Sequence, residues 1–326
     1  MTAMIVRRLV QVPLILLVIY TVTFALAWLL PGNPLDHEGR RPPVEVQDAM
    51  KAQYNLDHPL KFYVSYLDQA SGLAWLRGQG GDAAEAVHAA RPIFNLGPCL
   101  QYEDWSVNEI IGGALPVSIV LGLVALVMAL AIGLVAGVVG AVRPGSWMDV
   151  ATLLVALIGI SLPSFVIGTA LLIVFAVWFE WVHVAHWGSP RDLLLPALTL
   201  SLPFAAYIAR LTRLGMIEVL SADFIRTARA KGVSEMRIVL RHALKVAFLP
   251  VLSYLGPAAA YVMTGSFVVE KVFNIPGLGQ HFVNSVLNKD LFMIMGVVLT
   301  YSTMLVLFNL TIDILYRWVD PRIEPA

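Results

Sequence analysis

Six stretches of this sequence are long, apolar and free of charged side chains, and they constrain the fold more than any other feature. A helix needs about 20 consecutive apolar residues to cross the hydrocarbon core of a bilayer. The stretches lie at about residues 9–30, 111–142, 150–179, 193–209, 246–269 and 291–312. They predict an all-α polytopic membrane protein with six transmembrane helices.

Composition agrees with this class and excludes others. The 326 residues are 58% hydrophobic and only 13% charged, which is far too apolar for a soluble domain. The formal net charge is zero, so charge gives no argument for a nucleic-acid partner. Cys99 is the single cysteine, which excludes an intrachain disulfide and a cysteine-based metal cluster.

The N-terminal region, residues 1–30, has two interpretations. Arg7 and Arg8 precede an apolar run, as they do in a secretory signal, and Ala25-Leu26-Ala27 resembles a cleavage site. The run is longer than the roughly 7–15 residues of a signal core, which favours an uncleaved transmembrane helix.

The region between the first two spans, residues 31–105, is richer in proline, glycine and charge than its neighbours. It contains no run long enough to cross a bilayer. Helical apolar spacing predicts short helices over 44–54 and 60–70, whereas 72–90 is rich in glycine and alanine and is predicted to be loosely ordered. We interpret the region as an extracytoplasmic loop domain that acts as a lid or spacer.

Small residues mark one face of the second span. Gly133, Gly137 and Gly140 lie at spacings that allow two helix backbones to approach closely. The sequence does not say whether the partner helix belongs to the same chain or to another subunit.

Prolines predict kinks or breaks in the third span, at Pro163, and in the fourth, at Pro196 and Pro203. Ser161 and Ser164 flank the first of these prolines, so a break there would present polar groups in an apolar span. Ser161, Pro163 and Ser164 are therefore candidates for lining a translocation path. Ordinary packing is the alternative.

Lysine and arginine bias predicts the orientation. With the N-terminus in the cytoplasm, the short outer connections hold only Arg191, Lys271 and Lys289. The inner side then holds Arg7, Arg8, Arg143, Arg210, Arg213, Arg226, Arg229, Lys231, Arg237, Arg241, Lys245, Arg317 and Arg322. Both termini, including the tail 321–326, are predicted to be cytoplasmic.

Residues 223–245 form the one long basic segment between spans. Residues 223–231 read as a short helix ended by Gly232, which suits the left-handed position after a helix. Ser234 is placed to cap a second helix that begins at Glu235. Such an elbow suits docking to a partner protein, binding of anionic lipid, or an ordinary positive-inside loop. Spacing alone does not separate these three, and nearby membrane spans disfavour a DNA-binding role.

Several chemistries are absent from the sequence. It contains no phosphate-binding loop, no His-Glu-x-x-His and no paired-cysteine metal spacing, so no nucleotide hydrolysis or metal catalysis is predicted. The centres of the spans lack ionisable residues, which disfavours a proton-coupled carrier acting alone. His183 and His186 stand beside tryptophans, as in an interfacial aromatic belt, with a metal site as the alternative. A permease driven by another protein fits best.

Several motifs resemble one family, the ABC importer permeases of the dipeptide and oligopeptide group. They are Arg226-Thr-Ala-Arg-Ala-Lys-Gly232, Arg241-His-Ala-Leu, Leu249-Pro250, Gly159-Ile-Ser-Leu-Pro-Ser-Phe165, Pro196-Ala-Leu-Thr-Leu, Val269-Glu-Lys-Val-Phe273, Pro276-Gly-Leu-Gly279 and Asp320-Pro-Arg322. Arg7-Arg8 and Pro31-Gly-Asn-Pro34 fit as well. Residues 95–108 are most similar to the oligopeptide permease B subunit. Two features depart from the family pattern. Arg226-Thr227-Ala228 stands where importers in general have Glu-Ala-Ala, so the acid is missing. The segment 72–94 is longer than the connection that is usual in the family.

The resemblance implies a type I importer fold, with residues 106–320 as a five-helix permease core and 221–245 as its coupling elbow. It implies a bacterial inner-membrane protein that is not itself an enzyme. The implied partners are a second permease subunit, a substrate-binding protein, a peptide substrate, membrane lipid and two ATPase subunits, which bind the ATP and Mg. Implied ATPase-coupling residues are Asp223, Arg226, Thr227, Ala228, Arg229, Ala230, Lys231, Gly232, Arg237 and Arg241.

Four further residues, Glu270, Pro276, Gly277 and Gly279, are candidates for a gate or for contact with the binding protein. A simple turn with an interfacial ion pair is the alternative. The expected substrate is an oligopeptide, with dipeptides, nickel chelates or glycosides as alternatives within the family. A stand-alone ion-coupled carrier is the alternative from another class.

Overall fold

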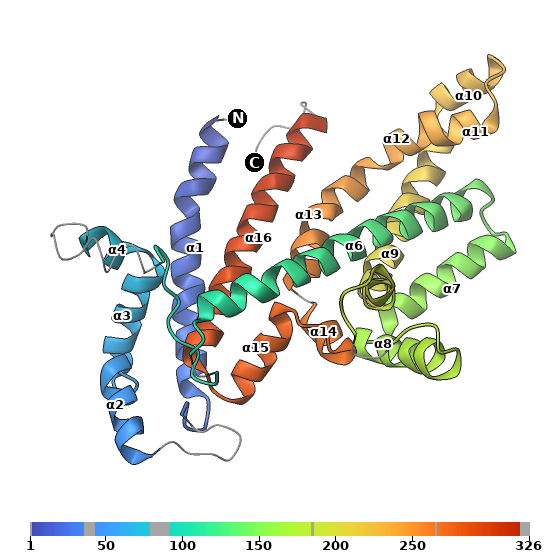
Figure 1. Cartoon of the computed structure of the whole chain (residues 1–326). Helices are drawn as coiled ribbons and strands as arrows, with labels where there is room; N and C mark the ends of the chain where they lie inside the picture. Colours follow the sequence, from blue (N-terminus) through green and yellow to red (C-terminus); the bar gives the residue numbers. More distant parts are fainter. Residues whose placement is uncertain are drawn as a thin grey trace. The chain divides into compact units, whose positions relative to one another are not determined.

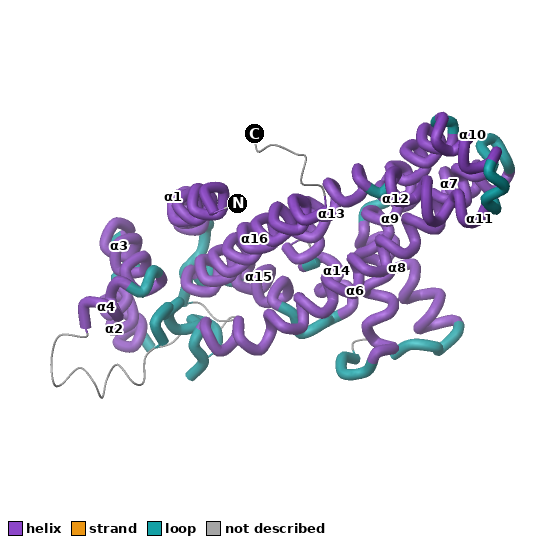
Figure 2. Tube along the Cα trace, turned by 90° about the horizontal axis from the view of Figure 1, so that it is seen from above, coloured by secondary structure: helices purple, strands orange, loops and turns teal. Residues whose placement is uncertain are grey.

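The computed structural model describes residues 2–35, 43–78, 92–102, 104–183, 186–264 and 266–319. Within these ranges the regular structure is helical, and one isolated β-bridge joins Pro98 to Ser106 (Figure 2). The all-α prediction is confirmed. The stretch 79–91, the motif Asp320-Pro-Arg322 and the tail 321–326 lie outside the described residues.

The chain divides into two compact units (Figure 1). The first unit comprises Met1–Pro116 and Gln280–Met304, and the second comprises Val117–Gly279 and Leu305–Ala326. The expected division into a loop domain and a permease core stays a prediction; residues 280–304 group with the first unit.

Four continuous helices are long and apolar enough to cross a membrane: α1 (Thr2–Leu29), α6 (Val107–Val142), α9 (Pro190–Leu220) and α16 (Leu291–Val319). Two bent pairs satisfy the same test, and counting each pair as one span gives up to six. The first pair is α7 (Trp147–Ser161) with α8 (Ser164–Leu172) and its π-helical continuation η1 (Ile173–Trp178). The second pair is α11 (Glu235–Arg237), η2 (Ile238–Ala243) and α12 (Leu244–Ala247) with α13 (Leu249–Thr264).

The prolines have unequal effects. The predicted third span is bent by 108° at Leu162–Pro163, because proline lacks an amide hydrogen and holds the preceding residue in an extended conformation. Pro196 and Pro203, by contrast, lie inside the continuous helix α9. The sequence predicted a kink or a break at these two positions; the helix is not broken there, and a kink stays a prediction. α9 is packed in the core of its unit, and this packing holds the helix together across both prolines.

In the first unit, an aromatic cluster fixes the helices that follow the first span. The predicted helices are confirmed as α2 (Val44–Tyr54) and α3 (Pro59–Ala70), while α4 (Leu73–Gly78) forms where loose order was expected. The Tyr20 hydroxyl of α1 donates to the Tyr63 carbonyl at 2.6 Å. Phe62 is buried and lies 5.2 Å, between ring centroids, from Phe292.

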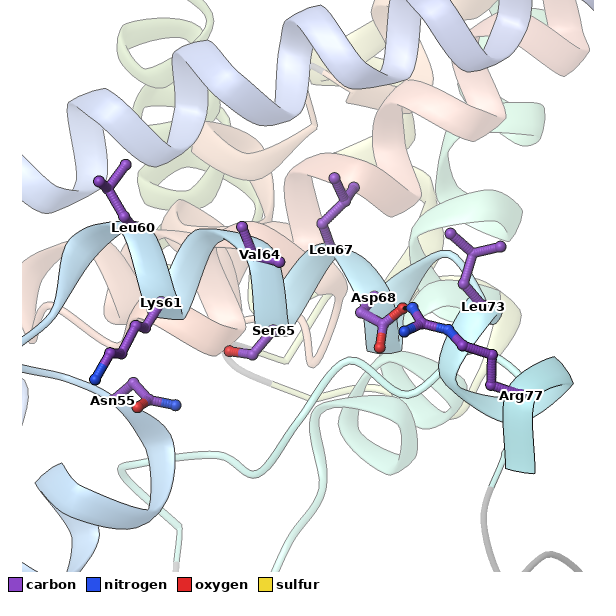
Figure 3. A pocket seen from close by; sticks show the side chains of 9 residues that line it. All are labelled: Asn55, Leu60, Lys61, Val64, Ser65, Leu67, Asp68, Leu73 and Arg77. Carbon is purple, nitrogen blue, oxygen red and sulfur yellow. Dashed lines mark hydrogen bonds and ion pairs between the residues drawn. The ribbon is translucent and has the colours of Figure 1, made fainter.

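A groove of about 640 Å³ runs along α3 and α4 (Figure 3). Leu60, Val64 and Leu73 contribute apolar side chains to it. The Asp68 carboxylate and the Arg77 guanidinium form an ion pair at one end. The groove thus lies in the extracytoplasmic region predicted from the sequence.

A buried carboxylate anchors the extended segment before α6. Asp290 has no exposed surface and accepts hydrogen bonds from the Leu100 amide at 2.8 Å, the Met293 amide at 3.1 Å and the Cys99 thiol at 3.2 Å. Burial raises the pKa of Asp290 above its usual value. Burial also raises the pKa of the Cys99 thiol, to about 12.

The second unit is built around α9. Its core joins side chains of α6, α9, α13 and α14 (Phe267–Phe273). α6 lies so close to α9 that a Cβ on Gly133 would meet the Ala205 carbonyl oxygen at 2.7 Å, and one on Gly137 would meet the Ala209 carbonyl oxygen at 2.6 Å. The glycine face predicted from the sequence therefore packs within the chain.

Candidate functional site at the helical elbow

The predicted elbow, residues 221–245, is a folded structure with its own apolar base (Figure 1). It comprises α10 (Asp223–Ala230), α11 and η2. Ile225, Ile238 and Ala243 turn inward and pack against Met216 of α9 and Ala141 of α6. The elbow is thus attached to two long helices of the second unit.

Gly232 closes the first helix in the way that the sequence predicted. It has φ +77°, and its amide donates to the Arg229 carbonyl at 2.9 Å. The Val233 amide donates to the Ala228 carbonyl at 3.2 Å, and both of these side chains pack against the base. The two bonds and the apolar contact form a Schellman motif, in which glycine supplies the left-handed residue. The angle between the helices is therefore set locally.

An ion pair joins the two helices α10 and α11 of the elbow. Arg229 Nε donates to Glu235 Oε1 at 2.8 Å, and Arg229 Nη2 donates to Oε2 at 3.2 Å. Ser234 occupies the predicted cap position of α11, but its side chain makes no capping bond. That part of the prediction was wrong, and the side chain of Glu235 instead bridges to α10.

The outer face of the elbow combines cations with apolar side chains. Most of the predicted coupling residues are exposed, namely Asp223, Arg226, Thr227, Arg229, Ala230, Lys231, Gly232, Arg237 and Arg241, whereas Ala228 packs toward the base. Phe224, Met236 and Leu240 are also 49%, 70% and 54% exposed. Sequence reasoning missed these three, although apolar residues within a basic segment were the available signal. A surface of this mixture is typical of protein interfaces.

A bidentate ion pair lies near the elbow base and was not predicted. Arg213 of α9 donates through Nε to Asp149 Oδ1 at 2.6 Å and through Nη2 to Oδ2 at 2.8 Å. Asp149 also accepts the Gly145 amide at 2.8 Å. The pair fixes the start of α7 to α9, and its members are 64 residues apart in sequence.

The path candidates lie at the bend of the third span. Ser161 ends α7, Pro163 has φ −58° and ψ 140°, and Ser164 begins α8. Ser161 and Pro163 are exposed in the chain, and Ser164 is half-buried. α8 also packs on α14, where a Cβ on Gly168 would meet Phe273 at 3.1 Å. A role of these residues in the path remains a prediction.

The predicted gate residues meet at a buried carboxylate. Glu270 is fully buried, Gly277 and Gly279 are buried, and Pro276 is exposed. Glu270 accepts hydrogen bonds from Ser266 of the same turn and from Ser118 of α6. Ser118 carried no signal in the sequence. Because the carboxylate is enclosed, Glu270 presents no surface to a partner.

The alternative metal site at the histidines gains no support. The His186 imidazole Nδ1 lies 2.8 Å from Asp192 Oδ2, next to the start of α9. Asp192 also accepts the Ser189 amide at 2.9 Å, which completes a capping box. Among the described residues, no group of three or more histidine, cysteine, aspartate or glutamate side chains is placed to hold a metal ion.

Comparisons with known proteins agree with this architecture. The family described as "Binding-protein-dependent transport system inner membrane component" matches residues 129–325. The oligopeptide transport system permease protein OppB of Haemophilus influenzae is 39% identical over 321 residues, covering 98% of each chain. The dipeptide transport system permease protein DppB of Bacillus subtilis is 40% identical over 310 residues, covering 95% of this chain and 94% of the relative.

A solved structure supports the fold alone. The inward-facing MetNI methionine ABC transporter aligns with a TM-score of 0.54 at 19% identity, covering 65% of this chain and 97% of that chain. The family model and the two relatives confirm the family predicted from the motifs, and the solved structure confirms the fold. The chain belongs to the binding-protein-dependent transport system inner membrane component family and has the fold of a type I ABC importer permease.

Proposed function

We propose that this chain is one of two permease subunits of an ATP-driven importer of oligopeptides. A substrate-binding protein delivers the peptide at the outer face. Two ATPase subunits bind ATP and Mg, dock on the inner elbows and drive the cycle, so that this chain hydrolyses nothing itself. Both termini lie in the cytoplasm, as the lysine and arginine bias predicts.

The elbow is the observation that carries this proposal. Its angle is fixed by the Gly232 motif and the Arg229–Glu235 pair, and its base is packed on α6 and α9. Its outer face exposes Phe224 and Met236 among cations. Water or lipid headgroups would account for the cations, but a partner protein accounts for the exposed apolar side chains as well.

The names of the relatives suggest two candidate substrates. The Haemophilus protein is named for oligopeptide transport and the Bacillus protein for dipeptide transport, at similar identity. Oligopeptide is the primary candidate, because residues 95–108 are most similar to that group, and dipeptide is the second. Uptake of trialanine against dialanine in cells carrying the complete transporter separates the two.

Gly232→Val tests the elbow against a matched control, Gly145→Val. Both glycines have φ +77°, and a Cβ added at either position would have no neighbour within 4 Å, so the backbone strain imposed by valine is the same. We expect Gly232→Val to reduce co-purification of the ATPases and peptide uptake. Gly145→Val, outside the elbow, should retain both. Equal losses in the two variants would mean that the elbow has no special role.

Charge reversal tests whether the cations contact a partner protein. Arg226→Glu and Lys231→Glu alter exposed side chains, so we expect assembly with the ATPases to weaken while insertion of the chain is unchanged. Arg143→Glu changes another exposed inner arginine outside the elbow and serves as control. A loss of the same size in Arg143→Glu would favour general attraction to anionic lipid.

Reconstitution tests the stand-alone carrier. The chain purified alone in vesicles should take up no peptide under a proton or sodium gradient. The full complex should take it up only with ATP. Gradient-driven, nucleotide-independent uptake by the chain alone would overturn the proposed function.

A further inference from the structure

Glu270 is a buried carboxylate held by three donor residues of the second unit that come from separate parts of the chain. Its Oε1 accepts the Ser266 hydroxyl at 2.6 Å and the Ser118 hydroxyl at 2.8 Å. Its Oε2 accepts the Gly279 amide at 2.8 Å. Ser118 belongs to α6, Ser266 precedes α14, and Gly279 lies in the first turn of α15 (Leu278–Leu287).

The protons of this network have fixed directions. The Ser118 oxygen accepts the Leu278 amide at 2.9 Å, so its own hydrogen is free to point at Glu270. The amides of Leu278 and Gly279 are first-turn donors of α15, which have no partner inside a helix. Ser118 and Glu270 supply those partners. The carboxylate of Glu270 therefore accepts hydrogen bonds from Ser118, Ser266 and Gly279.

The glycines of the turn are required by this arrangement. A Cβ on Gly277 would overlap the Glu270 carboxylate and would lie 2.8 Å from the Ser118 hydroxyl. A Cβ on Gly279 would lie 2.9 Å from Glu270 Oε2 and would overlap the backbone of Phe267. The motif Pro276-Gly-Leu-Gly279 thus allows the turn to close over the carboxylate.

The network joins parts of the second unit that are far apart in sequence. Ser118 lies on α6, and Gly279 lies at the end of the turn 274–279. Glu270 accepts hydrogen bonds from both, although Ser118 and Glu270 are 152 residues apart.

We propose that Glu270 is a positioning residue for transport, whose carboxylate holds α6 and the turn 274–279 together during the transport cycle. This inference rests on the proposed importer function. The carboxylate is buried and acts through Ser118 and the turn 274–279. Without this connection, α6 and the turn move separately, and ATP hydrolysis at the elbows is no longer converted fully into movement of the path.

Glu270→Gln is the direct test because it keeps the shape of the side chain. An amide has one acceptor oxygen, so its NH2 must face either the Gly279 amide or the two serine hydroxyls. In the full complex we expect trialanine uptake to fall by about tenfold or more, the scale of leaving buried hydrogen-bond donors without an acceptor. Assembly should persist, and the ATP hydrolysed per peptide should rise. Glu180→Gln, at an exposed glutamate, is the matched control.

A second readout does not depend on the substrate. Ile275 lies in the turn and is buried, so Ile275→Cys should react slowly with a membrane-impermeant maleimide. Adding Glu270→Gln should raise that rate, because the turn is released. Ser118→Ala removes one donor and should also raise the labelling rate of Ile275→Cys, but by less. This variant provides the test if Glu270→Gln fails to assemble.

The outcomes are distinguishable. Normal uptake and unchanged Ile275→Cys labelling in an assembled Glu270→Gln complex would overturn the inference. So would a loss of uptake that merely follows a loss of assembled complex in both Glu270→Gln and Ser118→Ala. Absence of peptide uptake by the unaltered complex would refute the proposed function instead, and the labelling rates would then judge the role of Glu270 alone.

Discussion

Adding one methyl group at Gly137 should separate the two helices that form the centre of the second unit. In Gly137→Ala the new Cβ would lie 2.5 Å from Thr212 Cβ and 2.6 Å from the Ala209 carbonyl oxygen. Ordinary contacts begin at 3.4 Å, so α6 and α9 have to move apart locally by about 1 Å. One of the two obstacles is backbone, which cannot rotate away.

The same substitution at Gly113 provides the reference on the same helix. A Cβ on Gly113 meets no atom within 4 Å. Both variants gain the helix propensity of alanine over glycine, about 1 kcal/mol, so this contribution cancels in their comparison. What remains is the overpacking at Gly137, which costs about 1–3 kcal/mol. Gly137→Ala should therefore be the less stable of the two by that amount.

Thermal unfolding of the two purified variants in lipid nanodiscs measures this difference. For a unit of roughly 200 residues, 1 kcal/mol shifts Tm by about 2–4 °C, so Gly137→Ala should melt several degrees below Gly113→Ala. Adding Thr212→Ala should restore only part of the loss, because the Ala209 carbonyl remains. Equal melting temperatures, or a lower one for Gly113→Ala, would refute the close α6–α9 packing.

Three further outcomes are expected. Thr212 is fully buried, and its hydroxyl has no partner among the described residues, so Thr212→Val should leave Tm unchanged or raise it by an amount equivalent to about 1–3 kcal/mol. Cys99 should resist maleimide in the folded protein at pH 8, because a pKa of about 12 leaves a thiolate fraction of roughly 10⁻⁴, and it should react once denaturant is added. Burial raises the pKa of Asp290, so its contribution to stability is complete below the ordinary value of 3.8 and is lost as pH rises through the folded value. The Tm of the unaltered protein minus that of Asp290→Asn should accordingly grow as the pH is lowered, and a constant difference would contradict this.

The elbow was predictable because its signals are local. A glycine after a short amphipathic run, followed by a serine and a glutamate, specifies a helix end and a new helix within a dozen residues. The ion pair between Arg229 and Glu235 also spans only six residues. The sequence does not show that this pair forms while the Ser234 side chain makes no cap, because both depend on side-chain placement. The exposure of Phe224 was not predictable, because an apolar side chain beside the buried Ile225 is equally consistent with burial in the base.

The long-range contacts were not predictable. Ser118 and Glu270 are 152 residues apart, and Asp149 and Arg213 are 64 apart, and no periodicity connects either pair. Proline identified a break at Pro163, but the size of the bend depends on what α7 and α8 pack against. The same residue type left α9 intact at Pro196, because burial on several sides outweighed the lost hydrogen bond.

The backbone contact between α6 and α9 decides where the second unit is able to bend. Two helices in contact along Gly133 and Gly137 resist bending more than either helix would alone. The elbow packs against one end of this helix pair. At Leu162–Pro163 the helix is interrupted, and the proline removes a backbone hydrogen bond there. We expect bending to occur more easily at this interruption than along the α6–α9 contact.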